Sequence, residues 1–219
     1  MTARVRTGVL ISGRGSNLQA LIDACAKADF PAEIACVISN VANVEGLARA
    51  ERAGIATHVI SHGGFRLREE FDMELDATLT RAAVSLVCLA GFMRVLSDVF
   101  VEKWRGRLIN IHPSLLPGFK GLDVHGRVLA SGARISGCTV HFVVSELDSG
   151  PIIAQAAVPV LADDTEETLA ARTLAAEHRL YRHALKLVAE GRARLGGAGV
   201  VFTDVPDAKG VLFSPAVYE

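Results

Sequence analysis

Short hydrophobic runs alternate with stretches of mixed apolar and polar residues along most of the chain. Apolar runs of roughly four to eight residues, bounded by glycine or polar positions, are typical of buried strands. The runs that fit are Val5 to Ile11, Ile34 to Ser39, Thr57 to Ile60, Val84 to Leu89, Leu108 to Ile111, Gly137 to Val144 and Ile152 to Val158. Because helical patterns separate most of these runs, an α/β protein is predicted.

Helix boundaries are indicated by capping residues. Ser16 and Gln19 have the spacing of a capping box, and Asn43, Ser97 and Thr165 are candidate N-caps. Glycines follow the expected ends of several of these segments. The predicted helices run from Asn17 to about Ala26, from Asn43 to Ala53, from Arg66 to Ala83, from Ser97 to Gly106 and from Thr165 to near Glu190.

The order of these elements predicts one domain. Strand and helix alternate from the start, so we expect a single unit over residues 1–219, with its core over about 5–190. The sheet should be mostly parallel and twisted, with helices on both faces. Residues 192–219 are rich in Gly, Val and Pro and form a C-terminal extension, expected to be a hairpin or an irregular tail.

A parallel sheet also predicts where ligands bind. In open α/β sheets they bind outside the carboxyl ends of the strands. Three stretches fall at such ends: Ser12 to Asn17, Gly91 to Leu96 and Asn110 to Pro117.

Composition narrows the class of protein. The net charge of −1 gives no electrostatic case for nucleic acid or an anionic membrane as a partner. The four cysteines are scattered without metal-type spacing, as expected of small core residues in a reducing compartment. The longest apolar run, Ala82 to Met93, is too short to span a bilayer, and the N-terminus lacks a signal-peptide pattern. We therefore expect a cytoplasmic enzyme that needs no metal.

SGRGSN, residues 12–17, follows the first strand and precedes the first helix. Its glycines allow a tight turn with exposed backbone N–H groups, and a helix N-terminus favours an anion such as phosphate. The dinucleotide fingerprint is incomplete, because Leu18 replaces its third glycine and Ser39-Asn40 stand where an acid is expected. The loop therefore indicates a phosphate site or, alternatively, a plain βα turn.

Asn110 and His112 lie two residues apart at the end of a predicted strand and so point to the same face. An amide and an imidazole together can hold an oxyanion, and the imidazole can move a proton. A pair that caps the loop backbone is the alternative. Asp148 lies in an ordinary turn sequence and would orient His112 only if the fold brings the two together. His141, inside a strand, is either a core hydrogen-bonding group or part of the site.

Five segments together resemble the folate-dependent phosphoribosylglycinamide formyltransferases. The similarity runs from about residue 5 to about residue 190, with the motifs in the family's order. The matching segments are LISGRGSNLQALI (10–22), LAGFMRVLS (89–97), NIHPSLLP (110–117), GCTVHFV (137–143) and ELDSGPII (146–153).

This resemblance implies a Rossmann-like formyltransferase fold and a reaction. A formyl group would pass from 10-formyltetrahydrofolate to the amine of glycinamide ribonucleotide in de novo purine biosynthesis. Asn110, His112 and Asp148 match the family's catalytic trio, and His141 matches a supporting histidine. No metal is implied, the partners are small molecules only, and a monomer or homodimer is expected.

The resemblance also assigns binding residues. Those matched to the ribonucleotide phosphate and ribose are Gly15, Ser16, Asn17 and Glu177. Those matched to the folate are Arg68, Met93, Arg94, Val95, Leu96 and Asn110. Two positions depart from better-known members: Leu174 replaces a polar residue one turn before Glu177, and Asp123 stands where some members have a histidine.

Three other functions share part of this pattern. Methionyl-tRNA formyltransferase would need a basic RNA-binding domain after the last long helix, and formyltetrahydrofolate hydrolase would need a regulatory domain before the first strand. A non-catalytic phosphate-binding module would not need Asn110, His112 and Asp148 together.

Overall fold

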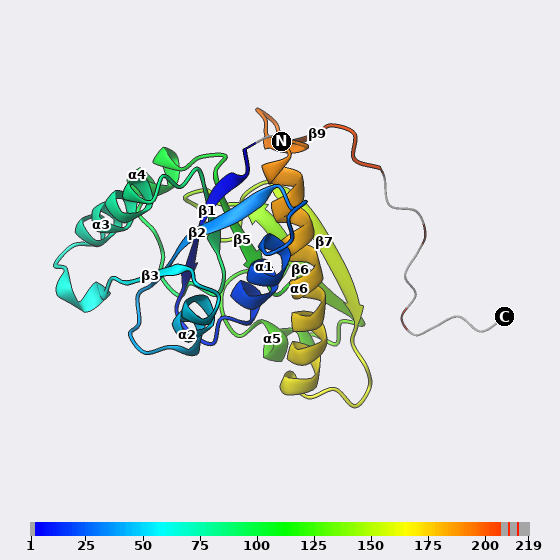
Figure 1. Cartoon of the computed structure of the whole chain (residues 1–219). Helices are drawn as coiled ribbons and strands as arrows, with labels where there is room; N and C mark the ends of the chain where they lie inside the picture. Colours follow the sequence, from blue (N-terminus) through cyan, green and yellow to red (C-terminus); the bar gives the residue numbers. More distant parts are fainter. Residues whose placement is uncertain (1–2, 207–209, 211–213, 215–219) are drawn as a thin grey trace.

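A seven-stranded sheet forms the centre of the protein (Figure 1). The computed structural model describes residues 3–206 together with 210 and 214. The strands of this sheet are β1 (Val5–Ile11), β2 (Ala32–Ser39), β3 (Ala56–Val59), β4 (Leu86–Leu89), β5 (Leu108–His112), β6 (Ile135–Phe142) and β7 (Ile152–Pro159). Their order is β3-β2-β1-β4-β5-β6-β7. The pairs from β3 to β5 are parallel, and β5–β6 and β6–β7 are antiparallel, so the predicted mostly parallel sheet is confirmed.

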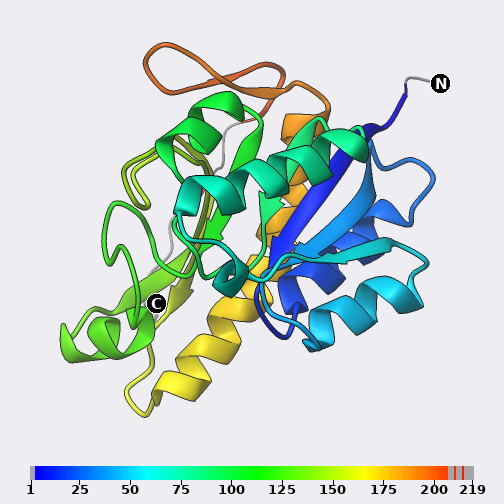
Figure 2. The same cartoon turned by 90° about the vertical axis from the view of Figure 1, so that its left-hand side faces the viewer.

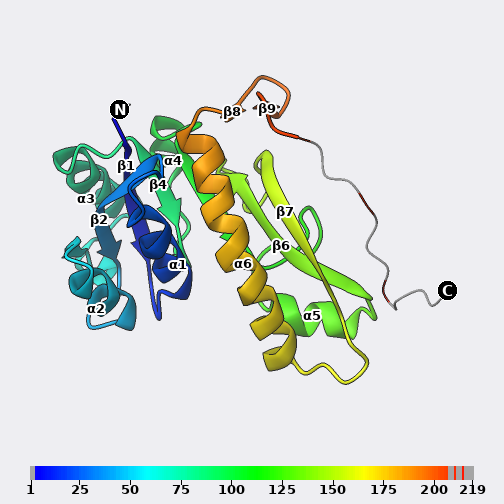
Figure 3. The same cartoon turned by 45° about the vertical axis from the view of Figure 1, so that its right-hand side comes forward.

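Helices cover both faces of the sheet. They are α1 (Ser16–Cys25), α2 (Glu45–Arg52), the short 3₁₀ turn η1 (His62–Gly64), α3 (Arg68–Arg81), α4 (Asp98–Lys103), α5 (Val124–Ala130) and α6 (Glu166–Ala189). One buried cluster joins the sheet to α1, α2 and α6, and another joins it to α3 and α4. Figures 2 and 3 show these two layers from different sides. The expected helices on both faces are therefore confirmed.

Two of the four predicted helix caps are present. Ser97 accepts a hydrogen bond from the Phe100 N–H, and Thr165 forms a capping box with Thr168. The capping box predicted at Ser16 is wrong, because the left-handed Gly15 is the N-cap and α1 begins at Ser16 itself. The cap predicted at Asn43 is also wrong. Asn43 adopts a left-handed conformation, and Val44 stands at the N-cap of α2.

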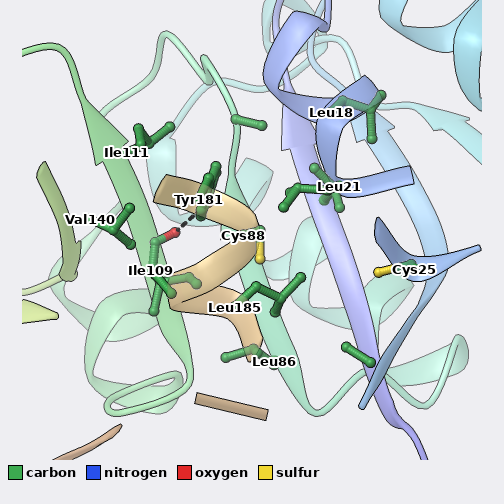
Figure 4. Packing of buried hydrophobic residues seen from close by; sticks show 14 of the residues in the cluster. Leu18, Leu21, Cys25, Leu86, Cys88, Ile109, Ile111, Val140, Tyr181 and Leu185 are labelled. Atoms are coloured by element: carbon green, nitrogen blue, oxygen red, sulfur yellow. Dashed lines mark hydrogen bonds between the residues drawn. The ribbon is translucent and has the colours of Figure 1, made fainter. Parts of the chain in front are cut away.

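Tyr181 links α6 to two central strands, β4 and β5. Its buried hydroxyl donates to the carbonyl oxygens of Leu89 and Ile109, at 2.9 and 3.2 Å. Figure 4 shows the ring among the core residues, with the bond to Ile109 drawn. Burial raises the pKa of this phenol well above its usual value, so the proton needed for the bond is kept. Tyr181 thereby fixes α6 against the two adjacent strands β4 and β5.

After α6, the chain forms a small hairpin of β8 (Ala193–Leu195) and β9 (Val200–Phe202). This agrees with the hairpin expected for part of the C-terminal extension. Most of residues 207–219 lie outside the described residues. Among the helices of the described chain, none combines the length and apolar character that crossing a membrane requires.

Candidate active site

The loop after β1 is folded tightly against α2. Gly15 has a left-handed backbone with φ of 70°, and a Cβ at that position would lie 2.6 Å from the Cα of Gly46. The Gly46 N–H donates to the Gly13 carbonyl at 3.1 Å, and the Arg49 Nε donates to the Arg14 carbonyl at 2.9 Å. Glycine is therefore required at position 15 both by conformation and by space.

Asn17 ties the same loop to α6. Its Nδ2 donates to the Glu177 carboxylate at 2.6 Å, across 160 positions of sequence. Burial raises the pKa of Glu177, and the hydrogen bond from Asn17 partly offsets this effect. The Oδ1 of Asn17 is buried and has no protein partner among the described residues. Such an atom is available for a ligand that carries a donor.

A cavity of about 620 Å³ opens at the carboxyl ends of β4 and β5. Asn110, His112, His141 and Asp148 all line it. The Nδ1 of His112 lies 3.3 Å from a carboxylate oxygen of Asp148, and the two side chains are only 7% and 8% exposed. Asp148 therefore does meet His112, which the sequence left open.

The loop after β5 holds both members of this pair. The Nε2 of His112 donates to the Phe119 carbonyl at 3.0 Å, and the Gly121 N–H donates to Asp148 at 2.9 Å. Each ring nitrogen of His112 thus faces an acceptor atom. Only an imidazolium, with a proton on both nitrogens, donates to both partners. Phe119 and Gly121 contribute backbone atoms, which leave no signature in the sequence.

His141 points into the site from the neighbouring antiparallel strand. In the ladder it is opposite Asn110. Its Nδ1 donates to the Phe142 carbonyl at 2.9 Å, so its Nε2 is free to accept from the Asn110 Nδ2 at 3.3 Å. Burial lowers the pKa of His141, which favours the neutral ring that this arrangement needs. His141 therefore orients the Asn110 amide and leaves its second N–H for the cavity.

Residues 91–96, which include the residues that the resemblance matches to the folate, also line the cavity, and we call them the folate segment. Met93, Arg94, Val95 and Leu96 all line the space, with apolar support from Val101 and Val143. The Arg94 guanidinium lies 4.9 Å from the centre of the Phe71 ring. The cavity thus offers an apolar surface and exposed backbone groups, which suit a flat heteroaromatic ring.

Not every predicted residue reaches this cavity. Arg68 is the exposed first residue of α3 and is not part of the lining. Leu174 is half-buried on α6, and Asp123 lines the cavity with a left-handed backbone at the start of α5. His125 and Glu166 also line it. Neither residue is among the site residues expected from the sequence.

Metal ligation has no counterpart in the described part of the chain, where no group of three or more His, Cys, Asp or Glu could hold an ion. All four cysteines are buried and unpaired. Burial raises the pKa of each thiol, to about 11 for Cys25 and Cys36 and about 12 for Cys138. These thiols are therefore inert core groups and not nucleophiles.

Comparisons with known proteins agree with this geometry. Residues 5–185 match the formyl transferase family model. The chain is 48% identical to phosphoribosylglycinamide formyltransferase of Escherichia coli over 85% of its own length and 88% of that protein. A crystal structure of glycinamide ribonucleotide transformylase 1 from Symbiobacterium toebii superposes with a TM-score of 0.90 at 46% identity, covering 93% of this chain and 96% of that one.

The chain belongs to the formyl transferase family, whose model matches most of it. Within that family, it is similar to phosphoribosylglycinamide formyltransferases along most of their length, so the resemblance seen in the motifs is confirmed. It is also 54% identical to a trifunctional purine biosynthetic protein of Gallus gallus over 91% of this chain. The chain spans about a fifth of the length of that relative.

Proposed function

We propose that this chain transfers a formyl group from 10-formyltetrahydrofolate to the amine of glycinamide ribonucleotide in de novo purine biosynthesis. The observation that carries the proposal is the convergence of Asn110, His112 and Asp148 in one cavity. The folate segment lies across that cavity, and the loop at residues 12–17 lies at the same edge of the sheet. A pair that merely capped the loop backbone would not need a buried carboxylate partner.

The trio supplies what attack of an amine on a formyl carbon requires. Negative charge develops on the formyl oxygen as the amine attacks, and preorganised donors stabilise that charge. His112 supplies an N–H donor, and Asp148, 3.3 Å from its Nδ1, orients the ring. Because Nε2 donates to the Phe119 carbonyl without ligand, we propose that it exchanges this partner for the formyl oxygen.

Asn110 provides the second donor. Its amide is oriented by neutral His141, which leaves one N–H directed to the cavity. The proton released by the attacking amine must reach the departing folate nitrogen, and His112 is placed to move it, directly or through a water molecule. No covalent intermediate on the enzyme is required, because no activated Ser or Cys lines the cavity.

We propose the following division of the binding residues. The ribonucleotide phosphate and ribose are bound by Gly15, Ser16, Asn17 and Glu177. The folate is bound by Met93, Arg94, Val95, Leu96 and Asn110, with Arg68 at the outer end. The fit is supported by the tight loop with a helix N-terminus behind it and by the apolar wall of the cavity.

The remaining features of the protein are also proposals. We propose one catalytic domain over residues 1–219 that acts in the cytoplasm as a monomer or homodimer, without nucleic acid or membrane as a partner. The four free cysteines support a reducing compartment, and the net charge of −1 supports small-molecule substrates only.

An acceptor assay tests the proposal. The purified chain is given 10-formyltetrahydrofolate with glycinamide ribonucleotide, with initiator methionyl-tRNA or with water alone, and formylated product is measured. We expect rapid transfer to the ribonucleotide and at most trace reaction with the others. Preferred transfer to tRNA or water would replace this function by one of its relatives. Binding of both ligands without any transfer would leave a binding module.

A further inference from the structure

The folate segment is held by very few hydrogen bonds. Its entrance is fixed where the Ala90 N–H donates to the Leu10 carbonyl at 2.9 Å. Its exit is fixed where the Ser97 N–H donates to the Asp72 carboxylate at 2.6 Å. Between these ends, the described residues provide one bond only, from the Met93 N–H to the Ser12 Oγ at 2.8 Å. Phe92 packs beside the Phe71 ring and Arg94 lies over it, but among the described residues Ser12 makes the only hydrogen bond to the middle of the segment.

Ser12 is itself oriented by a second bond. Its hydroxyl donates to the Oδ1 of Asn40 at 2.5 Å, and Asn40 is buried directly after β2. The single hydroxyl proton is thus used on Asn40, which leaves an oxygen lone pair for the Met93 N–H. The ends of β1, β2 and β4 meet at this one oxygen atom.

Ser12 is also the first residue of the loop that the proposed function assigns to phosphate. The residues that follow are bonded to α2 through Gly46 and Arg49 and to α6 through Glu177. A ligand that fixes the conformation of this loop also fixes the position of Ser12. Through the Met93 N–H, that effect passes directly to the opposite substrate site.

We infer that Ser12 is a positioning residue that couples the two substrate sites. A bound ribonucleotide holds Ser12, and Ser12 holds the middle of the folate segment in the conformation that receives the folate. The coupling is reciprocal, so bound folate also strengthens ribonucleotide binding. This inference rests on the proposed function, and it adds to that function an order between the two sites.

Calorimetry of two ligands tests the coupling. A 5-deazafolate without a transferable formyl group is titrated into the protein with and without saturating glycinamide ribonucleotide. In the wild type we expect binding about fivefold tighter with ribonucleotide present, the scale of a modest coupling between sites. In Ser12→Ala we expect the dissociation constants with and without ribonucleotide to be nearly equal, so that their ratio is near one. The alanine methyl group cannot accept the hydrogen bond from the Met93 N–H.

Three further variants control the measurement. Ser12→Thr keeps the hydroxyl and should restore the ratio. Ser85→Ala removes a hydroxyl that bonds the Arg6 carbonyl at the other edge of the sheet, so it should keep the wild-type ratio. If Ser12→Ala does not fold, Ser12→Cys replaces it in the measurement. Cysteine has nearly the size of serine but its sulfur is a weak hydrogen-bond acceptor, so the coupling should again be reduced.

Hydrogen exchange and kinetics supply independent readouts. Without ligand, the Met93 amide should exchange several times faster in Ser12→Ala than in the wild type. In turnover, the KM for folate should rise several-fold with kcat nearly unchanged, since Ser12 touches no reacting atom. In the contrary outcome, Ser12→Ala binds the deazafolate with the same ribonucleotide-dependent gain in affinity as the wild type, with unchanged exchange of the Met93 amide. That result would overturn the inference while formyl transfer remained intact. Absence of transfer in the wild type would instead overturn the proposed function.

Discussion

The loop at residues 12–17 and the folate segment lie at the same edge of the sheet, yet they are held very differently. The loop is bonded to α2 at Gly13 and Arg14 and to α6 at Asn17. The folate segment has the single bond from Met93, whose side chain is 66% exposed. The loop that we propose binds phosphate is thus bonded at several points, whereas the middle of the segment that we propose binds folate has one hydrogen bond and is expected to gain more order on binding.

The proposed catalytic trio lines the same cavity as the folate segment, and removing it gives the largest expected effect. Asn110→Ala, His112→Ala and Asp148→Asn should each lower kcat by roughly a hundredfold or more, the scale of losing one oxyanion donor or general acid. KM for either substrate should change little in His112→Ala and Asp148→Asn, because these side chains act on the transition state. Asn110→Ala should also raise the KM for folate, since Asn110 is among the residues proposed to bind it. Steady-state kinetics with each substrate varied in turn measures both quantities.

The double variant His112→Ala with Asp148→Asn sharpens this test. Its loss should be much smaller than the product of the two single losses, since the pair acts as one unit. Losses that multiply in full, or near-normal turnover of His112→Ala, would return Asn110 and His112 to the role of loop caps.

The rigidity of the loop can be broken at Gly15. Gly15→Ala places a Cβ against Gly46 in a left-handed backbone, so the loop must separate from α2. We expect the KM for ribonucleotide to rise by roughly tenfold or more while the KM for folate rises far less. Gly54→Ala is the matched control, with the same φ of 70° and nothing within 4 Å of the added atom. Equal effects on both substrates would argue against a phosphate role for this loop.

The adaptability of the folate segment predicts a change in hydrogen exchange. At saturation, a 5-deazafolate should slow exchange of the amides of residues 91–96 by roughly tenfold or more. Amides of residues 13–17 should change much less, because that loop is already bonded. Protection elsewhere, with none in residues 91–96, would place the folate in another cleft.

The smallest expected effect is a pH dependence of stability. It should arise from the Asn17–Glu177 bond that holds the loop, and not from the Ser12–Met93 bond that holds the folate segment. The folded-state pKa of Glu177 is raised by burial, so above the carboxyl's usual range the folded protein holds a proton that the unfolded chain has lost. The contribution of Glu177 to stability should therefore decline as pH rises through the raised pKa. Glu177→Gln keeps an acceptor for Asn17 and stays neutral, so this decline should disappear.

Urea unfolding at a series of pH values from 4.5 to 8 measures the decline, with the exposed Glu69→Gln as the control variant. Identical pH profiles for the wild type and Glu177→Gln would contradict the prediction. The Ser12 anchor of the folate segment has no titrating group of its own, so Ser12→Ala should leave the profile unchanged.

Much of the fold follows from local patterns. The apolar runs predicted the strands of the central sheet, and the helix predicted from Arg66 to Ala83 corresponds to α3. Helix caps were less predictable, since a serine before a helix is also compatible with a glycine turn, as at Gly15 and Ser16. The antiparallel pairing of β6 and β7 has no marker in the alternation of apolar residues.

By itself, the sequence determined that Asn110 and His112 share one face at the end of a strand, because side-chain direction in a strand alternates with each residue. It also determined the tight glycine loop before α1. Only the tertiary structure decided that Asp148 meets His112, that Glu177 meets Asn17 and that Ser12 meets Met93. These meetings depend on strand order and on how separate loops pack at one edge of the sheet. Local periodicity carries no information about such distances, because they are set by packing between elements far apart in the chain.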